Sequence, residues 1–265
     1  MSTEPAFGAC APTPTQRRLI HSAHKSFLKR GTFRPFMART LEAIRKGPLD
    51  LHFMDIPFRL RPLRSSADLG MTFNPDYNGK EIRFLLAAIP QGGLFVDIGC
   101  NIGMYSLPIA KQIAPKGRVI GIEPHPEALG YLAFNLQNAN LTNFTLIECA
   151  VGDFTGEAVI ETNLRNLGAS QIKADGNTII PIRPLLDVLN EQNVQRIDAL
   201  KIDIEGYEDR ALLPFFQNAS QSLWPKVISI EHLSHRVWQS DIITALKHYG
   251  YEATGRTRSN LLLQR

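Results

Sequence analysis

The stretch GLFVDIGCNIGMYS, residues 93–106, joins an apolar strand to a glycine-containing turn and then to a helical pattern. The apolar run contains one carboxylate, Asp97, and the turn reads Gly-x-Asn-x-Gly over Gly99, Asn101 and Gly103. Glycine permits tight backbone geometry and lets a ligand approach the main chain closely. In open α/β sheets, ligands bind at the carboxyl ends of the strands. The stretch therefore predicts a ligand-binding turn at the edge of a sheet.

The chain from Lys80 onward alternates strand-like apolar runs with helical patterns. We expect strands over residues 94–99, 118–123, 144–150, 198–204 and 226–231. We expect helices over about residues 80–89, 103–113, 126–138, 207–217 and 239–249. Strand–helix–strand units with short connections predict a parallel sheet with right-handed crossovers, and thus an α/β fold.

Two regions depart from this alternation. The segments GEAVIETN (156–163) and NTIIPIRPL (177–185) are predicted to form two extra strands, followed by a short helix in LLDVLNEQ (185–192). The chain ends with YEATG, the turn RTRS and NLLLQR. This hairpin leaves little room for a crossover helix, so the last strand is expected to be antiparallel.

Residues 1–60 are predicted to form a separate N-terminal extension, and residues 61–265 the main domain. Residues 1–15 are rich in Pro, Thr and Ala and are expected to be disordered. Two short helices and then short edge strands, interrupted by Pro57 and Pro62, are expected to follow. From its position alone, we hypothesise that the extension covers the site as a cap.

The charge of the first 50 residues is strongly basic, with nine Lys/Arg against three Asp/Glu. A basic segment can bind nucleic acid, an acidic lipid surface or an acidic substrate. A solvated helical face explains the same charges more simply, since no aromatic residues are interleaved as on a nucleic-acid surface.

The bulk composition describes an ordinary globular protein of 265 residues. No apolar run approaches the roughly 18–20 residues of a membrane span, and the N-terminus lacks the pattern of a secretory signal. The three cysteines, Cys10, Cys100 and Cys149, form no CxxC pair. We therefore expect no disulfide framework, no zinc site and a cytoplasmic location.

Asp97 and Glu123 indicate the kind of ligand. A carboxylate before the turn would repel a pyrophosphate but suits a cation such as S-adenosylmethionine, which carries an ammonium and a sulfonium. The turn also lacks the G-x-G-x-x-G spacing of a nicotinamide dehydrogenase. Glu123 ends the second strand about 20 residues later, where an acidic side chain takes ribose hydroxyls. Alternatively, Glu123 serves the dipole of the following helix.

The third strand ends in two small residues, Cys149 and Ala150, against which a flat adenine could lie. Small residues are common at strand ends, so this signal is weak. Cys149 is interpreted as a packed thiol. Cys100 is interpreted as a small filler rather than a nucleophile, because no histidine or aspartate in the sequence obviously pairs with it.

The fourth strand, in ALKIDIEGYE, places Lys201, Asp203 and Glu205 on one face. Ionised groups on a buried face are costly unless they are paired or functional. Lys201 could pair with Asp97 or Asp203 in a structural network. Asp203 and Glu205 lie at the carboxyl end of the strand, where reacting groups are expected, and are candidate catalytic residues.

The fifth strand, in VISIEHLSH, ends in Glu231 and His232. We interpret His232 as the one histidine at this edge and as a candidate general base, with a structural histidine as the alternative. The carboxylates Asp203, Glu205 and Glu231 could join His232 in an oxygen-rich metal site. No ligand-spacing motif supports such a site, and no metal is expected.

The segments FVDIGCNIGMYS, IEPHPEALGYLAFNLQNANLTNFTLIECAVGD, IRPLLDVL, LKIDIEGYE and ISIEHL resemble, in order and spacing, the FkbM-type methyltransferases. These belong to the class I S-adenosylmethionine-dependent enzymes. The resemblance covers about residues 60–265, and the family usually has Ala where Cys100 stands. It implies a Rossmann-like fold with a seven-stranded, mostly parallel sheet, an antiparallel last strand and helices on both faces. The N-terminal helical extension lies outside it.

The resemblance also implies where S-adenosylmethionine binds. The implied contacts are Asp97, Gly99, Asn101, Gly103 and Glu123, with Ala150 near adenine and Asp203 near the methyl donor. It further implies O-methylation of a small hydroxylated acceptor, such as a sugar, a polyketide or another secondary metabolite.

We hypothesise that His232 or Asp203 accepts the hydroxyl proton. The alternatives are an RNA or other N-methyltransferase and a non-catalytic nucleoside-binding protein. N-methylation of bases is disfavoured because the chain has DIEGY where such enzymes carry an Asn/Asp-Pro-Pro-aromatic block.

Overall fold

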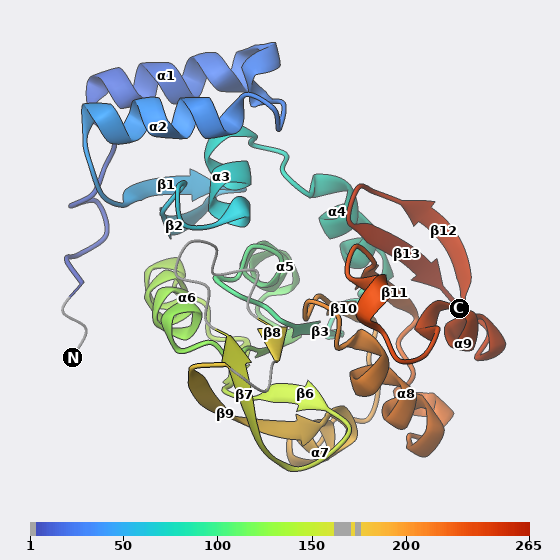
Figure 1. The fold of residues 1–265 in the computed structure, drawn as a ribbon. Coiled ribbons are helices and arrows are strands. Elements are labelled where there is room, and N and C mark those ends of the chain that lie inside the picture. Colours follow the sequence, from blue (N-terminus) through green and yellow to red (C-terminus); the bar gives the residue numbers. More distant parts are fainter. Residues whose placement is uncertain (1–3, 162–170, 173–175) are drawn as a thin grey trace.

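The computed structural model describes residues 4–161, 171–172 and 176–265 (Figure 1). Its centre is a seven-stranded sheet in the order β12-β13-β11-β10-β3-β4-β5. The strands are Leu94–Ile98 (β3), Arg118–Ile122 (β4), Phe144–Ile147 (β5), Ala199–Ile202 (β10), Val227–Glu231 (β11), Glu252–Arg256 (β12) and Asn260–Gln264 (β13). Neighbours from β5 to β11 are parallel, whereas β13 is antiparallel to β11 and β12. The predicted Rossmann-like sheet with an antiparallel last strand is confirmed.

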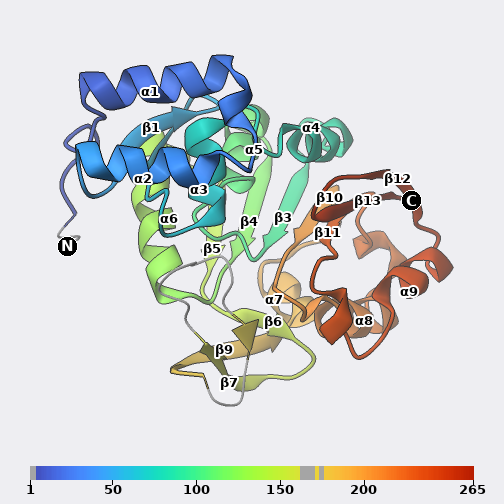
Figure 2. The same cartoon turned by 45° about the horizontal axis from the view of Figure 1, so that its top comes forward.

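Helices cover both faces of this sheet (Figure 2). On one face, the apolar sides of β3 and β10 pack against α7, α8 and α9. On the other face they pack against α4, α5 and α6. The bounds are Gly79–Ala88 (α4), Ser106–Ile113 (α5), Pro126–Ala139 (α6), Leu185–Glu191 (α7), Glu208–Asn218 (α8) and Ile242–His248 (α9), with short 3-10 turns at Gln221–Leu223 (η3) and His235–Val237 (η4).

A second sheet has four strands in the order β6-β9-β7-β8; it follows β5 in the chain, and its strands β6 and β9 contact α8 and α7. Its strands are Ala150–Gly152 (β6), Gly156–Glu161 (β7), Gln171–Ile172 (β8) and Thr178–Pro184 (β9). The two expected extra strands correspond to β7 and β9. The last two residues of the predicted 156–163 strand lie outside the described residues.

The N-terminal part forms two side-by-side helices above a small hairpin (Figure 1). Its elements are Pro14–Lys25 (α1), Phe27–Lys29 (η1), Arg34–Ile44 (α2), Leu49–Phe53 (β1), Ile56–Leu60 (β2) and Ser66–Phe73 (α3). A capping box between Thr13 and Gln16 starts α1. Apolar residues of α1, α2 and β1 share a core with Phe73 of α3. The hairpin's own apolar side chains join the core beneath α4, α5 and α6.

The expectation that residues 1–15 are disordered is wrong for residues 4–15, of which the last two begin α1. The backbone amides of Gly8 and Cys10 donate to the Asp50 carboxylate at 2.7 and 3.0 Å. Asp50 also accepts from Arg59, whose side chain is fully buried and reaches Glu4 at 2.9 Å. The composition of the segment could not reveal this, because its partners lie about 40–55 residues away.

None of the helices in the described ranges is long and apolar enough to cross a bilayer.

Candidate functional site

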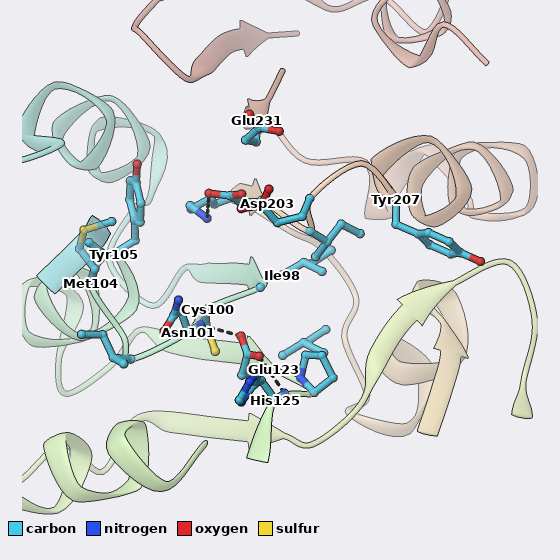
Figure 3. Close-up of a pocket in the computed structure, with 18 of the residues that line it drawn as sticks. Ile98, Cys100, Asn101, Met104, Tyr105, Glu123, His125, Asp203, Tyr207 and Glu231 are labelled. Atoms are coloured by element: carbon cyan, nitrogen blue, oxygen red, sulfur yellow. Dashed lines mark hydrogen bonds and ion pairs between the residues drawn. The ribbon is translucent and has the colours of Figure 1, made fainter. Parts of the chain in front are cut away.

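A cavity of about 390 Å³ opens at the carboxyl ends of β3, β4, β10 and β11 (Figure 3). This volume is within the range of small-molecule sites in proteins. The cavity also reaches β6–β8, the segment around Tyr77 and the turn between β12 and β13. It therefore lies where ligands bind in open α/β sheets.

The turn after β3 brings the main chain close to the loop after β10. Gly99 has φ +76°, and a Cβ there would lie 2.0 Å from the carbonyl oxygen of Asp203. Asn101 is also left-handed, with φ +50°. Only glycine combines this backbone conformation with so close an approach. Gly99 and Asn101 line the cavity.

Glu123 connects this turn to the end of β4. Its Oε2 accepts from the Asn101 amide at 2.8 Å, and its Oε1 accepts from the His125 amide at 2.9 Å. Burial raises the pKa of Glu123 to about 7. Each carboxylate oxygen has a second lone pair, so Glu123 can still accept from ligand hydroxyls.

His125 is a site residue that the sequence reasoning missed. Its Nδ1 accepts from the amides of Glu127 and Ala128 and caps α6. The neutral ring then carries its proton on Nε2. This nitrogen is buried, has no hydrogen-bond partner among the described residues, and belongs to a side chain that lines the cavity. The Pro-initiated helix after β4 was the available signal, because such a helix needs an N-cap.

Asp97 lies behind the cavity wall rather than in it. Ser106 Oγ donates to its Oδ2, while its Oδ1 lies 3.8 Å from Lys201 Nζ. Burial raises the pKa of Asp97, and Lys201 is the main influence in the opposite direction. Asp97 therefore supports the β3 turn through Ser106 and Lys201.

Lys201 bridges Asp97 to the loop after β10, with its Nζ 3.5 Å from Asp203 Oδ2. Burial disfavours its charge, but Asp203 and Asp97 together raise the pKa of Lys201. The expected pairing of Lys201 is confirmed, and it involves both carboxylates. Asp203 itself lines the cavity (Figure 3).

Glu205 and Glu231 lie at the same edge of the cavity. Burial, with the charges of Asp203 and Glu231, raises the pKa of Glu205 to about 8. Burial and Asp203 raise the pKa of Glu231 to about 7. The amides of Leu233 and Ser234 donate to Glu231 and fix its orientation, whereas Glu205 accepts only a 3.5 Å contact from Ser234 Oγ among the described residues.

Glu208, which the sequence reasoning also missed, stabilises the loop that carries Glu205 through hydrogen bonds. Its carboxylate accepts from the amides of Ile204 and Gly206 at 2.9 and 3.0 Å. Glu205 itself is left-handed, with φ +54°. A non-glycine residue rarely adopts this conformation, and such residues cluster at functional sites.

The structure does not place His232 in the cavity. Its Nδ1 contacts the carbonyl of Ser259 at 2.7 Å, and its Nε2 contacts Arg256 at 2.8 Å. Since a carbonyl only accepts and an arginine only donates, Nδ1 donates to Ser259 and Nε2 accepts from Arg256. Both nitrogens are thereby engaged, which favours the structural alternative for His232 over the role of general base.

The predicted site residues thus divide into two groups. Six line the cavity: Gly99, Asn101, Glu123, Ala150, Asp203 and Glu205. Three do not: Asp97, Gly103 and His232. Gly103 has φ +91° and packs against Leu107 and Leu132, so its role is in the turn that starts α5.

The two cysteines near the cavity are buried. Burial raises the pKa of Cys149 to about 11 and that of Cys100 well above its usual value, so both remain protonated. Within the described ranges, no group of three His, Cys, Asp or Glu side chains has an arrangement that could hold a metal ion.

The fold and the cavity define a Rossmann-like α/β protein with an acidic, nucleoside-sized site at the edge of its sheet. A family model described as the methyltransferase FkbM domain matches residues 97–253, more than half of the chain. The chain belongs to the FkbM methyltransferase family.

Individual relatives are more distant. Methyltransferase sdnD of Sordaria araneosa is 26% identical over 161 residues, which are 46% of this chain and 60% of that relative. The 23S rRNA (uracil(1939)-C(5))-methyltransferase RlmD of Acinetobacter baumannii is 28% identical over 100 residues, 36% of this chain and 21% of that relative. The chain thus spans less than two thirds of both curated relatives.

Among solved structures, the chain is similar to precorrin-6y C5,15-methyltransferase of Geobacter metallireducens. The TM-score is 0.45 with 13% identity, over 72% of this chain and 90% of that one.

Proposed function

We propose that this chain is an S-adenosylmethionine-dependent methyltransferase that methylates a hydroxyl group of a small-molecule acceptor. The observation that carries the proposal is the position of Glu123 and Glu205 in one cavity. Glu123 directly follows β4, where an acidic side chain takes ribose hydroxyls, and Glu205 follows β10, where reacting groups are expected. Membership of the FkbM family supports the same reading.

The residues of the cavity fit this cofactor. Beside Glu123, the apolar wall of Ile122, Ala150 and Val151 offers a slot for a flat adenine. Buried polar atoms without described partners, Asn101 Oδ1 and His125 Nε2, supply an acceptor and a donor for nucleoside groups. The carboxylate of Asp203 suits a ligand with positive charge.

When bound, S-adenosylmethionine supplies a methyl group that is already activated for transfer. The protein's task is then to align the acceptor, exclude water and take one proton; alignment alone can contribute roughly 7–11 kcal/mol. Lys201 holds Asp203 in place at the cavity wall. Glu205 is the candidate base: its raised pKa of about 8 makes the carboxylate a stronger base than usual, and only the ionised form, which predominates above that pH, can accept the hydroxyl proton.

An RNA acceptor is the alternative within the same class, and the basic N-terminal residues motivate it. Covalent activation of a base by cysteine requires a thiolate. Cys100 and Cys149 line the cavity, but burial raises the pKa of both thiols. The described residues therefore favour a hydroxyl acceptor over a pyrimidine carbon.

The test is a calorimetric titration with S-adenosylhomocysteine, with NADH as the control ligand. We expect S-adenosylhomocysteine to bind and NADH not to bind. Glu123→Gln should weaken binding by about 10–100-fold, since one of the two hydrogen-bond-accepting oxygens becomes an amide donor. The exposed Glu157→Gln on β7 is the matched control and should bind normally.

Methyl transfer from labelled cofactor is then measured with a panel of hydroxylated compounds and with total RNA. This assay distinguishes a small hydroxylated acceptor from an RNA acceptor. Transfer to hydroxyl compounds supports the proposal, whereas transfer to RNA favours the alternative. Tight binding with no transfer to either would favour a non-catalytic nucleoside-binding protein. Failure of the wild type to bind S-adenosylhomocysteine would contradict the proposal outright.

A further inference from the structure

Two arginines from distant parts of the chain lie at the mouth of the cavity. Arg258, in the turn between β12 and β13, lines the cavity. Arg34 is the first residue of α2, and its Cζ lies 5.0 Å from the ring centroid of Tyr77, which also lines the cavity. The N-terminal helices and the C-terminal hairpin therefore meet at this mouth.

Arg34 is held in a defined orientation. Its Nε donates to the carbonyl of Lys29 at 2.8 Å, and its guanidinium packs on Tyr77. These contacts leave the two terminal nitrogens for another acceptor. In the part of the chain that the structure describes, no carboxylate lies within 4.0 Å of Arg34 or Arg258.

The positive charges of Arg34 and Arg258 lie close enough to repel each other. A Cβ placed on Gly31, three residues before Arg34, would lie 3.8 Å from Nη1 of Arg258. Burial and the charge of Arg258 lower the pKa of Arg34, while the Tyr77 hydroxyl raises it. Two like charges held together without a counter-charge are unfavourable, and a bound anion would offset their repulsion.

Tyr77 connects this cationic mouth to the acidic floor of the cavity. Arg34, Arg258 and Asp203 all lie close enough to the Tyr77 hydroxyl to affect its pKa, which burial raises. The next residue, Asn78, donates to the hydroxyl of Tyr105 at 2.8 Å and fixes this wall. One small molecule can therefore extend along Tyr77 from the arginines to Asp203.

We propose that the methyl acceptor carries a carboxylate or phosphate group, which Arg34 and Arg258 bind while its hydroxyl group faces Asp203 and Glu205. Guanidinium groups bind both kinds of anion through paired hydrogen bonds. The inference rests on the proposed function and narrows it to acidic acceptors. It also gives the basic N-terminal helix α2 a role in selecting the acceptor.

The experiment compares matched pairs of small compounds in the presence of saturating S-adenosylhomocysteine. The pairs are 4-hydroxybenzoate with 4-hydroxybenzamide, and glycerol 3-phosphate with glycerol, so that carboxylate and phosphate are tested separately. Binding is measured by calorimetry for the wild type, Arg34→Gln and Arg258→Gln. Arg39→Gln, an exposed arginine on α2 that has no contact with Tyr77, removes the same charge as a control.

We expect the anionic member of at least one pair to bind the wild type about tenfold more tightly than its neutral partner. Both Arg34→Gln and Arg258→Gln should lose this preference, and Arg39→Gln should keep it. The affinity for S-adenosylhomocysteine should stay unchanged in all three variants.

Equal binding of acid and neutral compound by the wild type, including no binding of either, would overturn the proposal. So would a preference that survives both substitutions. A loss of S-adenosylhomocysteine affinity in Arg34→Gln or Arg258→Gln would instead assign the arginines to the cofactor carboxylate. If the wild type itself fails to bind S-adenosylhomocysteine, the proposed function fails, and the two failures are thereby distinguished.

Discussion

Lys201 lies directly opposite Asp97 in the register of the parallel strands β10 and β3, with 3.8 Å between Nζ and Oδ1. Both side chains are almost completely buried. A buried ion pair adds little net stability as a whole, but removal of one partner leaves an uncompensated charge. The pair is therefore a sensitive point in the centre of the sheet.

We expect Lys201→Met to lower the free energy of unfolding by roughly 3–5 kcal/mol. The reason is that Asp97 and Asp203 would lose their shared cation. Arg83→Met, which breaks an exposed pair with Asp76, should have a much smaller effect. Urea unfolding of both variants measures the difference, and equal stability of the two would contradict the structural role of Lys201.

Gly99→Ala should destabilise the protein by roughly 1–3 kcal/mol and abolish S-adenosylhomocysteine binding. The new methyl group would meet the carbonyl oxygen of Asp203 at 2.0 Å in a left-handed backbone conformation. Gly130→Ala in α6 is the control, because nothing lies within 4 Å of its added Cβ. That substitution should be neutral or slightly stabilising. Normal binding by Gly99→Ala would show that the turn tolerates a side chain.

Glu205 should make the stability of the protein depend on pH. Its pKa is raised from 4.5 to about 8 in the folded state, so the folded protein holds this proton more firmly than the unfolded chain. The corresponding stabilisation is fully present below about pH 4.5 and is lost as the pH rises to about 8. Glu205→Gln should flatten this part of the curve of thermal unfolding midpoint against pH. A curve unchanged by the substitution would show that Glu205 has an ordinary pKa.

His232→Asn should leave the rate of single-turnover methyl transfer within about twofold of the wild type, while Glu205→Gln should lower it by about 100-fold or more. His232 does not line the cavity and is hydrogen-bonded to Ser259 and Arg256, whereas Glu205 lines it. The reaction uses labelled cofactor and an acceptor from the panel. A large loss of rate in His232→Asn with normal thermal stability would restore the histidine as the base.

Local sequence patterns were sufficient to predict the parallel strands of the central sheet, because most of these strands are apolar runs that lie between helices with clear periodicity. The prediction for α5 began three residues early: Gly103 has φ +91° and belongs to the turn, not to the helix. The terminal hairpin was predictable because a two-strand unit with a short turn cannot be parallel.

The position of a residue in the cavity was predictable where the residue directly follows a strand, as Glu123 and Asp203 do. It was not predictable where the role depends on a partner far away in the sequence. His232 follows a strand end too, but its ring turns to Arg256, which is 24 residues away. The N-terminal segment was predicted to be disordered for the same reason, because the residues that bind it, Asp50 and Arg59, lie far away in the sequence.

The buried guanidinium of Arg59 has a practical consequence for anyone who shortens this protein. Residues 4–6 supply a carboxylate and two carbonyl oxygens to that group. Trimming them would leave part of a completely buried cation without acceptors, in contact with the ring of Phe134 on α6. The N-terminal segment is therefore a structural component of the domain, and a fusion or an affinity tag is better tolerated before it than in its place.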